Sequence, residues 1–240
     1  MDKKYELVKE DYIIFNDHKL FRVRALKKFQ TVNGRTVKAG DLGGYIQSEK
    51  NLSQEGSCWV SDNALVCDNA RVSDNARVSD NACVCSNAEV YDNACVDGNA
   101  KVYGHAWVSD NAWVYGNAKV YGHAWVSDNA WVYGNTKVYG NAYVCGDAEV
   151  SDNACVFDAA FVYGNSEVYG DAKVYGNARV YDNAKVCKNA MVFGKANVFG
   201  EAKVYGEAKV SGDAQVFGNA VVCDNTEVSG NTLVQKCLGV

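Results

Sequence analysis

Three cysteines near the start of a long repetitive region are the residues in this sequence best suited to metal or thiol chemistry. Cys67 stands in the tetrapeptide VCDN and Cys85 in the similar VCSN, with Cys83 two residues before Cys85. If the three thiols point outward from neighbouring turns of one structure, they are close enough to share a soft metal ion such as zinc. A fourth ligand is not apparent, so the preferred interpretation is that small cysteines simply suit a β-structure. The sequence therefore predicts no metal site and no cofactor.

Two histidines are the second chemical candidate. His105 and His123 each begin an identical copy of HAWVSDNAWVYGN. Asparagine usually fills this position of the repeat, and a neutral imidazole makes similar local hydrogen bonds, so structural substitution is the preferred interpretation. Catalysis and a pH-sensitive or ligand contact are the alternatives. No Ser-His-Asp order, phosphate-binding loop or carboxylate pair stands out, so we expect no catalytic residue and no enzyme.

Aromatic and basic side chains gather in the middle of the chain and form the candidate binding surface. Its members are Trp107, Trp113, Trp125, Trp131, Tyr103, Tyr115, Tyr121, Tyr133, Lys101, Lys119 and Lys137, together with His105 and His123. Four outward tryptophans in two successive turns make an apolar patch that a monomer seldom exposes. Such a patch would contact a protein, a second copy of the chain, or a planar or sugar ligand. The competing interpretation is that aromatic ladders stabilise the sheet and lysines keep it soluble.

The repeat that carries these residues has a period of six. Every sixth residue from Val60 to Val234 is valine, at 30 positions. Four residues after each valine from Val60 to Val228 stand 25 alanines and four serines or threonines. Two turn residues, usually Asp or Gly followed by Asn, lie between them and predict a tight corner. The remaining Ala-x-Val-x predicts a short strand with alternating inward and outward side chains. A six-residue valine period does not keep to one side of an α-helix, so we predict an all-β fold.

A second and longer period spans three of these units. The segment beginning at Lys101 matches the one beginning at Lys119 at 17 of 18 positions, differing only at Ala118 and Thr136. A short strand and a corner, repeated, must coil, and three such units close a triangle. We therefore predict a single-stranded parallel β-solenoid of about ten triangular coils, spaced about 4.8 Å apart, with every valine inward.

The repeat resembles the hexapeptide-repeat, left-handed parallel β-helix family, whose pattern is an aliphatic residue first and a small residue fifth. The resemblance covers roughly residues 52–236 and implies left-handed coils. The segments RALKKF and VKAGDLGGYIQSEKNLSQEGSCWV look like those of the YdcK-type proteins of this family, which implies architecture and little function. The acyltransferases of the family use a histidine beside an extruded loop, and its carbonic anhydrases use three histidines. An uninterrupted repeat with two histidines disfavours both activities.

The region before the repeat is predicted to be a separate β-hairpin cap over residues 1–57, followed by the β-helix over residues 58–240. Asn16-Asp17-His18 and Asn33-Gly34 predict two hairpin turns. Residues 1–50 carry 11 Lys and Arg against 7 Asp and Glu, a net charge of +4, and residues 51–240 carry 13 against 22, a net charge of −9. An acidic body argues against nucleic-acid binding along the repeat. No signal peptide and no long apolar run is visible, so we expect a cytoplasmic protein with reduced thiols and no membrane segment.

These observations favour a non-enzymatic β-solenoid scaffold or binding protein that acts through aromatic ladders on its middle coils. The expected partner is another protein or the chain itself, as a dimer or homotrimer. One alternative is a phage or mobile-element protein that antagonises a host defence factor by sequestration or surface mimicry. The other is a hexapeptide acyltransferase-like enzyme.

Overall fold

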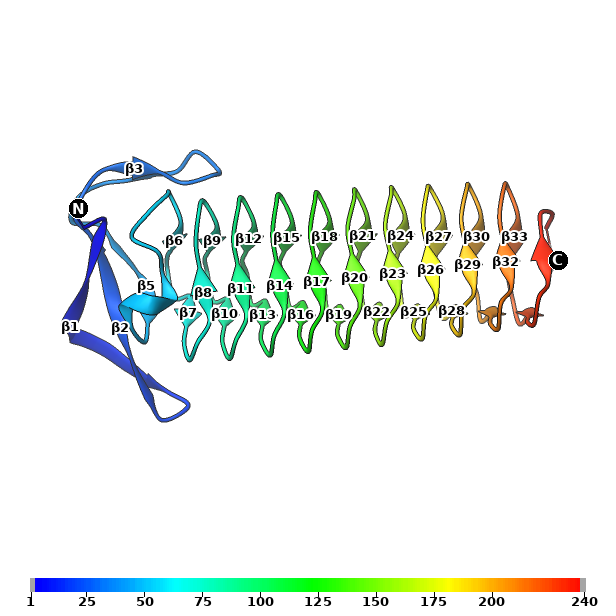
Figure 1. The fold of residues 1–240 in the computed structure, drawn as a ribbon, viewed down its shortest axis with the longest axis horizontal. Coiled ribbons are helices and arrows are strands. Elements are labelled where there is room, and N and C mark those ends of the chain that lie inside the picture. The colour runs from blue at the N-terminus through cyan, green and yellow to red at the C-terminus, as the bar shows by residue number, and fades with distance from the viewer. Residues whose placement is uncertain (1–2, 238–240) are drawn as a thin grey trace. The chain divides into compact units, whose positions relative to one another are not determined.

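The computed structural model describes residues 3–237 and divides into two compact units, Met1–Asn117 and Ala118–Val240. The repeat in each unit consists of very short parallel strands that stack coil upon coil, so that every third strand of the repeat pairs, as β7, β10 and β13 do in the first unit (Figure 1). The predicted all-β parallel solenoid with three sides to each coil is confirmed, and the left-handed sense stays what the family resemblance implies. Within residues 3–237 no helix is long and apolar enough to cross a membrane.

The first unit contains three parallel stacks, a separate hairpin and a short 3-10 helix. One stack continues into the N-terminal region and holds β1 (Tyr5–Phe15), β2 (His18–Ala25), β5 (Leu42–Ile46), β7 (Leu65–Val66), β10 (Cys83–Val84) and β13 (Lys101–Val102). The second stack holds β8 (Arg71–Val72), β11 (Glu89–Val90) and β14 (Trp107–Val108). The third holds β6 (Trp59–Val60), β9 (Arg77–Val78), β12 (Cys95–Val96) and β15 (Trp113–Val114). The hairpin pairs β3 (Phe29–Gln30) with β4 (Thr36–Val37), and the 3-10 helix η1 spans Glu49–Asn51.

The second unit repeats the same three stacks. One holds β16 (Lys119–Val120), β19 (Lys137–Val138), β22 (Cys155–Val156), β25 (Lys173–Val174), β28 (Met191–Val192), β31 (Lys209–Val210) and β34 (Glu227–Val228). Another holds β17 (Trp125–Val126), β20 (Tyr143–Val144), β23 (Phe161–Val162), β26 (Arg179–Val180), β29 (Asn197–Val198), β32 (Gln215–Val216) and β35 (Leu233–Val234). The third holds β18 (Trp131–Val132), β21 (Glu149–Val150), β24 (Glu167–Val168), β27 (Lys185–Val186), β30 (Lys203–Val204) and β33 (Val221–Val222).

The core of both units is made of the valine and alanine positions. All 30 valines of the repeat are buried, and so are its 25 alanines. The strands contain two residues, fewer than the four that the sequence pattern predicts. The physical reason lies in the alanine: the N–H of Ala64, for example, donates to the carbonyl oxygen of Ser61 at 3.1 Å and closes the corner, so it does not join the strand ladder.

The corners place a positive φ angle on the first of the two turn residues. Asp62 has φ of 58° and Gly98 has φ of 67°, whereas the asparagines that follow them do not have positive φ. A side chain at Gly98 would bring its Cβ to 2.9 Å from the backbone nitrogen of Gly116 in the next coil. Aspartate is suited to the same place for a different reason. The carboxylate of Asp80 accepts the N–H of Gly98 at 3.1 Å, and so gives the corner of the next coil a hydrogen-bond partner.

Both hairpins predicted in the N-terminal region are confirmed. β1 and β2 pair in antiparallel fashion around Asn16 and Asp17, whose φ angles are both positive, as a two-residue type I′ turn requires. β3 and β4 pair around a turn that contains Gly34, at φ of 80°.

The first coil begins inside this N-terminal region. β5 pairs with β2 on one edge and in parallel with β7 on the other, with Ile46 opposite Val66. Leu52 forms a bridge to Val72. The first coil therefore draws two of its three sides from residues before 58.

A buried lysine ties the N-terminal strand to the first coil. Lys4 is fully buried, and its ammonium group donates to the carbonyl oxygens of Glu55 and Cys58, both at 3.0 Å. It also lies 3.1 Å from the Cys58 sulfur. Beside it, the hydroxyl of Tyr5 donates to the carbonyl oxygen of Leu52 at 2.6 Å. Burial lowers the pKa of Lys4, because the protein interior disfavours the charged form of the amine. The hydrogen bonds to carbonyl oxygens offset the cost of burying this polar group.

Candidate functional site

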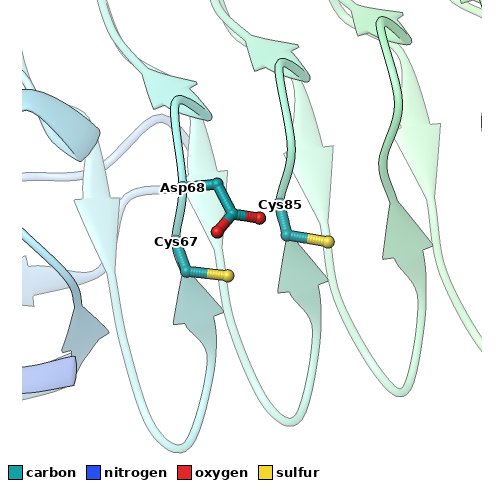
Figure 2. A group of neighbouring side chains, drawn as sticks. All are labelled: Cys67, Asp68 and Cys85. Carbon is teal, nitrogen blue, oxygen red and sulfur yellow. The ribbon is translucent and has the colours of Figure 1, made fainter. Parts of the chain in front are cut away.

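The structure brings two cysteines and an aspartate together on the first unit. Cys67 and Cys85 occupy equivalent places in successive coils, each directly after a core valine, and Cys67 N–H donates to Val84 O at 3.1 Å across the coils. A ligand atom from each of Cys67, Asp68 and Cys85 lies within 4.8 Å of the other two. Figure 2 shows both sulfurs and the carboxylate on the same side of the ribbon. The carboxylate is a potential ligand that the sequence analysis missed, because aspartate occurs at so many corners as a turn residue.

Asp68 is held in place from several directions. It is a corner residue with φ of 57°, and one of its oxygens accepts the N–H of Ser86 at 3.0 Å. Its other oxygen lies 3.6 Å from Nε2 of His18, at the start of β2. Its own N–H donates to the side-chain oxygen of Gln47 at 2.7 Å. The N-terminal region therefore reaches the thiol cluster through His18 and Gln47.

Cys83 completes a cluster of three thiols. It precedes Cys85 by two residues, so the two side chains leave the same face of the strand. Hydrogen bonds from Cys67 and Cys83 lower the pKa of Cys85 to about 3. The same bonds and burial raise the pKa of Cys67 and of Cys83. Lys101 lies opposite Cys83 in the next coil and also favours negative charge at the sulfurs. Within the cluster, negative charge is therefore favoured at Cys85 over the other two sulfurs.

The two histidines lie at exposed corners, His105 in the first unit and His123 in the second. His105 Nε2 lies 3.4 Å from Nδ2 of Asn87 in the preceding coil. Elsewhere in the same column, Asn69 donates to Asn87 in the equivalent way at 3.1 Å. His105 therefore stands in a ladder of corner amides, in the place that asparagine takes in other coils. The N–H of His123 donates to the carbonyl oxygen of Gly140 at 2.7 Å.

Aromatic ladders cover part of the second unit. One ladder has neighbouring ring centroids 4.8 to 5.0 Å apart and ring planes within 3° of parallel, and it consists of Tyr121, Tyr139, Phe157, Tyr175 and Phe193. A second ladder, which the sequence analysis did not identify, has spacings of 4.9 to 5.3 Å and consists of Tyr163, Tyr181, Phe199 and Phe217. Because the rings stack on one another between in-register strands, these ladders stabilise the sheet directly.

The tryptophans differ in exposure. Trp107 and Trp113 of the first unit have 40% and 37% of their surface exposed, and Trp131 of the second has 46%. Trp125 is half-buried, with its ring 5.6 Å from that of Tyr143. The expected binding surface therefore draws residues from both units, and the grouping of all four tryptophans into one patch stays a prediction.

The remaining members of the expected surface show graded exposure. Lys101 and Lys137 are exposed and Lys119 is half-buried. All four tyrosines are half-buried, and they are Tyr103, Tyr115, Tyr121 and Tyr133. Tyr115 packs edge-on against Trp113, with centroids 6.2 Å apart, and the Tyr133 hydroxyl donates to the Glu149 carboxylate.

The family comparison agrees with this architecture. The family model described as YdcK Beta solenoid repeat matches residues 70–86 and 172–188. These two segments of the chain are similar to YdcK β-solenoid repeats. One match lies in each unit, and the first includes Cys83 and Cys85 but not Cys67 or Asp68. No curated protein matches the chain. The match thus agrees with the coiled architecture at these two segments, and the function must be argued from the outward side chains.

Proposed function

We propose that the protein is a non-enzymatic β-solenoid scaffold that binds a protein partner through its exposed tryptophans. The observation that supports the proposal is the exposure of Trp107, Trp113 and Trp131, at 40%, 37% and 46%. Tryptophan buries a large area on contact and loses little side-chain entropy, which makes it the residue most enriched among the energetic centres of protein interfaces.

The stacked rings serve as the internal comparison. The ring of Tyr139 lies 4.9 Å from those of both Tyr121 and Phe157 and is nearly parallel to each. A ring with neighbours on both faces already contributes its apolar surface to the fold. The tryptophans also have contacts within the fold, as the Trp113 ring has with that of Tyr115, but their exposed fractions of 37 to 46% leave surface to bury against a partner.

The exposed lysines contribute less to binding. Lys101 and Lys137 lie on the surface, where a single exposed ion pair contributes about 0.2 to 1 kcal/mol. Their contribution is to the association rate and to its dependence on salt, because exposed charges are screened by ions.

The proposal is tested with one triple variant, Trp107→Ala, Trp113→Ala and Trp131→Ala. Light scattering measures the mass of the purified protein, affinity capture from the native host identifies bound proteins, and thermal unfolding measures stability. We expect the variant to lose self-association or partner capture, since loss of such a residue at an interface commonly costs more than about 2 kcal/mol. Because each tryptophan is also partly buried in the fold, the melting temperature of the variant should fall, and circular dichroism checks that the variant is folded.

The matched control is Tyr139→Ala, which removes a ring from the middle of a ladder. This variant should melt at a lower temperature and keep its mass and its captured proteins. A triple variant that self-associates and captures partners as the wild type does would contradict the proposal. So would a wild-type chain that is monomeric and captures no protein.

A further inference from the structure

We propose that the first unit carries a binding site for a soft divalent ion, of which zinc is the natural probe. Its ligands are the sulfurs of Cys67, Cys85 and Cys83 and one carboxylate oxygen of Asp68. The sequence alone predicts no metal site at these residues, because no fourth ligand is apparent in it. The site does not depend on the proposed binding of a protein partner, since it uses different residues.

The geometry of the three central ligands carries the inference. Atoms of Cys67, Asp68 and Cys85 lie within 4.8 Å of one another. In a tetrahedral zinc site with Zn–S near 2.3 Å and Zn–O near 2.0 to 2.2 Å, neighbouring ligand atoms are about 3.5 to 3.8 Å apart. The ligands must therefore approach by at most about an ångström, which rotation of the side chains supplies. The backbone already holds Cys67 and Cys85 in adjacent coils.

Cys83 is the fourth ligand because of its place on the strand. It precedes Cys85 by two residues, so it projects from the same side of the strand, and it is 8% exposed. Its sulfur is not among the ligand atoms that lie within 4.8 Å of one another, so its side chain must rotate toward them to complete the site. His18 is the competing candidate, but its imidazole lies at 3.6 Å from the Asp68 carboxylate. That contact suits a group that orients a ligating carboxylate.

The chemistry of the donors selects the ion. Thiolates favour zinc and other soft ions, whereas magnesium and calcium require oxygen ligands. Thiols lose their protons when they bind a metal, so affinity falls as the solution is acidified. A divalent ion with three thiolates and one carboxylate leaves two negative charges, and Lys101, in register with Cys83, lies beside the sulfurs to offset them. Asp68 is exposed, which gives the ion a path from solvent.

A bound ion would join two coils to the N-terminal region. Cys67 follows β7 and Cys85 follows β10, while His18 brings β2 to the Asp68 carboxylate. A ligand that binds only the folded state stabilises it in proportion to its concentration and affinity. Zinc should therefore raise the melting temperature of the full chain.

The experiment titrates the full-length, metal-free, reduced protein with Zn²⁺ and with Co²⁺. We expect one ion per chain, and a sulfur-to-cobalt charge-transfer band in the absorption spectrum. Cys67→Ser, Cys85→Ser and Asp68→Asn each remove a ligand and should weaken zinc binding more than about 100-fold, beyond the 10- to 100-fold typical of outer-shell changes. His18→Ala should weaken it about 10-fold.

Matched controls come from the same fold. Asp74→Asn changes a corner aspartate whose carboxylate accepts the N–H of Asp92 in the next coil, as that of Asp68 accepts the N–H of Ser86. Cys155→Ser changes a thiol of the second unit. Both should bind zinc as the wild type does. Circular dichroism checks that every variant is folded, and Asp68→Asn keeps an oxygen acceptor for Ser86 N–H.

Two results would overturn the site: a reduced wild-type chain that binds no zinc, or a Cys67→Ser, Cys85→Ser double variant that binds it unchanged. Full binding by Cys83→Ser would overturn Cys83 as the fourth ligand.

Discussion

Replacing a core valine by aspartate tests the assignment of inward and outward positions. Val174 on β25 is fully buried and lies between Val156 and Val192 of the adjacent coils. Val174→Asp removes the burial of valine, about 1.5 to 3 kcal/mol, and adds a buried carboxylate without a partner, several kcal/mol more. The expected loss is about 5 kcal/mol or more, comparable with the whole stability of a typical domain, about 5 to 15 kcal/mol. The coils around β25 should therefore unfold.

The control is Lys173→Asp, on the same strand but exposed, which should change stability little. Urea unfolding followed by circular dichroism compares the two variants. Desolvation raises the pKa of a buried carboxyl in the folded state above its unfolded value of about 3.9. The deficit of Val174→Asp should therefore be smallest below that pH, where the loss of valine burial remains, and should grow as the pH rises toward the folded-state pKa. Equal stability of the two variants at neutral pH would refute the reasoning.

Three further substitutions are measured by the same unfolding assay. Thr136→Ala should stabilise by up to about 1 kcal/mol, because the buried Thr136 hydroxyl has no hydrogen-bond partner; unchanged stability would contradict this. Lys4→Met should destabilise by at least about 2 kcal/mol, since it leaves carbonyl oxygens unpaired, and a neutral result would remove the proposed tie to the first coil. Burial raises the pKa of Asp97, so its ionised form destabilises the fold; Asp97→Asn should be more stable than wild type near pH 7 and equal to it below about pH 3.

The inward half of the fold could be predicted from the sequence because its rules are local. A small residue at one position and a valine at another fix which side chains fill the coil, and the prediction for Val60 to Val234 is confirmed at every valine. The hairpin turn at Asn16 and Asp17 was equally accessible, because two consecutive residues with positive φ favour that dipeptide.

The six-residue repeat does not predict the first coil, because the residues of this coil depart from the period. Val60 stands eight positions after Leu52, two more than the period of six, and Ile46 and Leu52 replace valine at the inward positions. Only the pairing of β5 with β7 reveals that these residues belong to the stack. Strand length was overpredicted for a related reason: the sequence shows which residues alternate, but not that the alanine N–H is used by the corner.

The outward residues were harder to interpret, since the core does not constrain them. Residue type alone could not separate the half-buried Trp125 from the exposed Trp107. Nor could it distinguish Asp68 from the other corner aspartates, because only the two neighbouring sulfurs give its carboxylate a second possible role.

In a fold of this kind, the place to look for function is the column of outward residues that stack from one coil to the next. A column of similar rings, such as the one that contains Tyr139 and Phe157, is explained by stacking. A column of chemically reactive groups is not explained by stacking, because two stacked thiols contribute little more packing than alanine or serine would contribute at the same positions. The Cys67 and Cys85 pair is such a column, and the corner that follows Cys67 adds a carboxylate to it. Stacking therefore turns residues that are isolated in the sequence into a cluster with the donor set of a metal site, without any loop or insertion in the repeat.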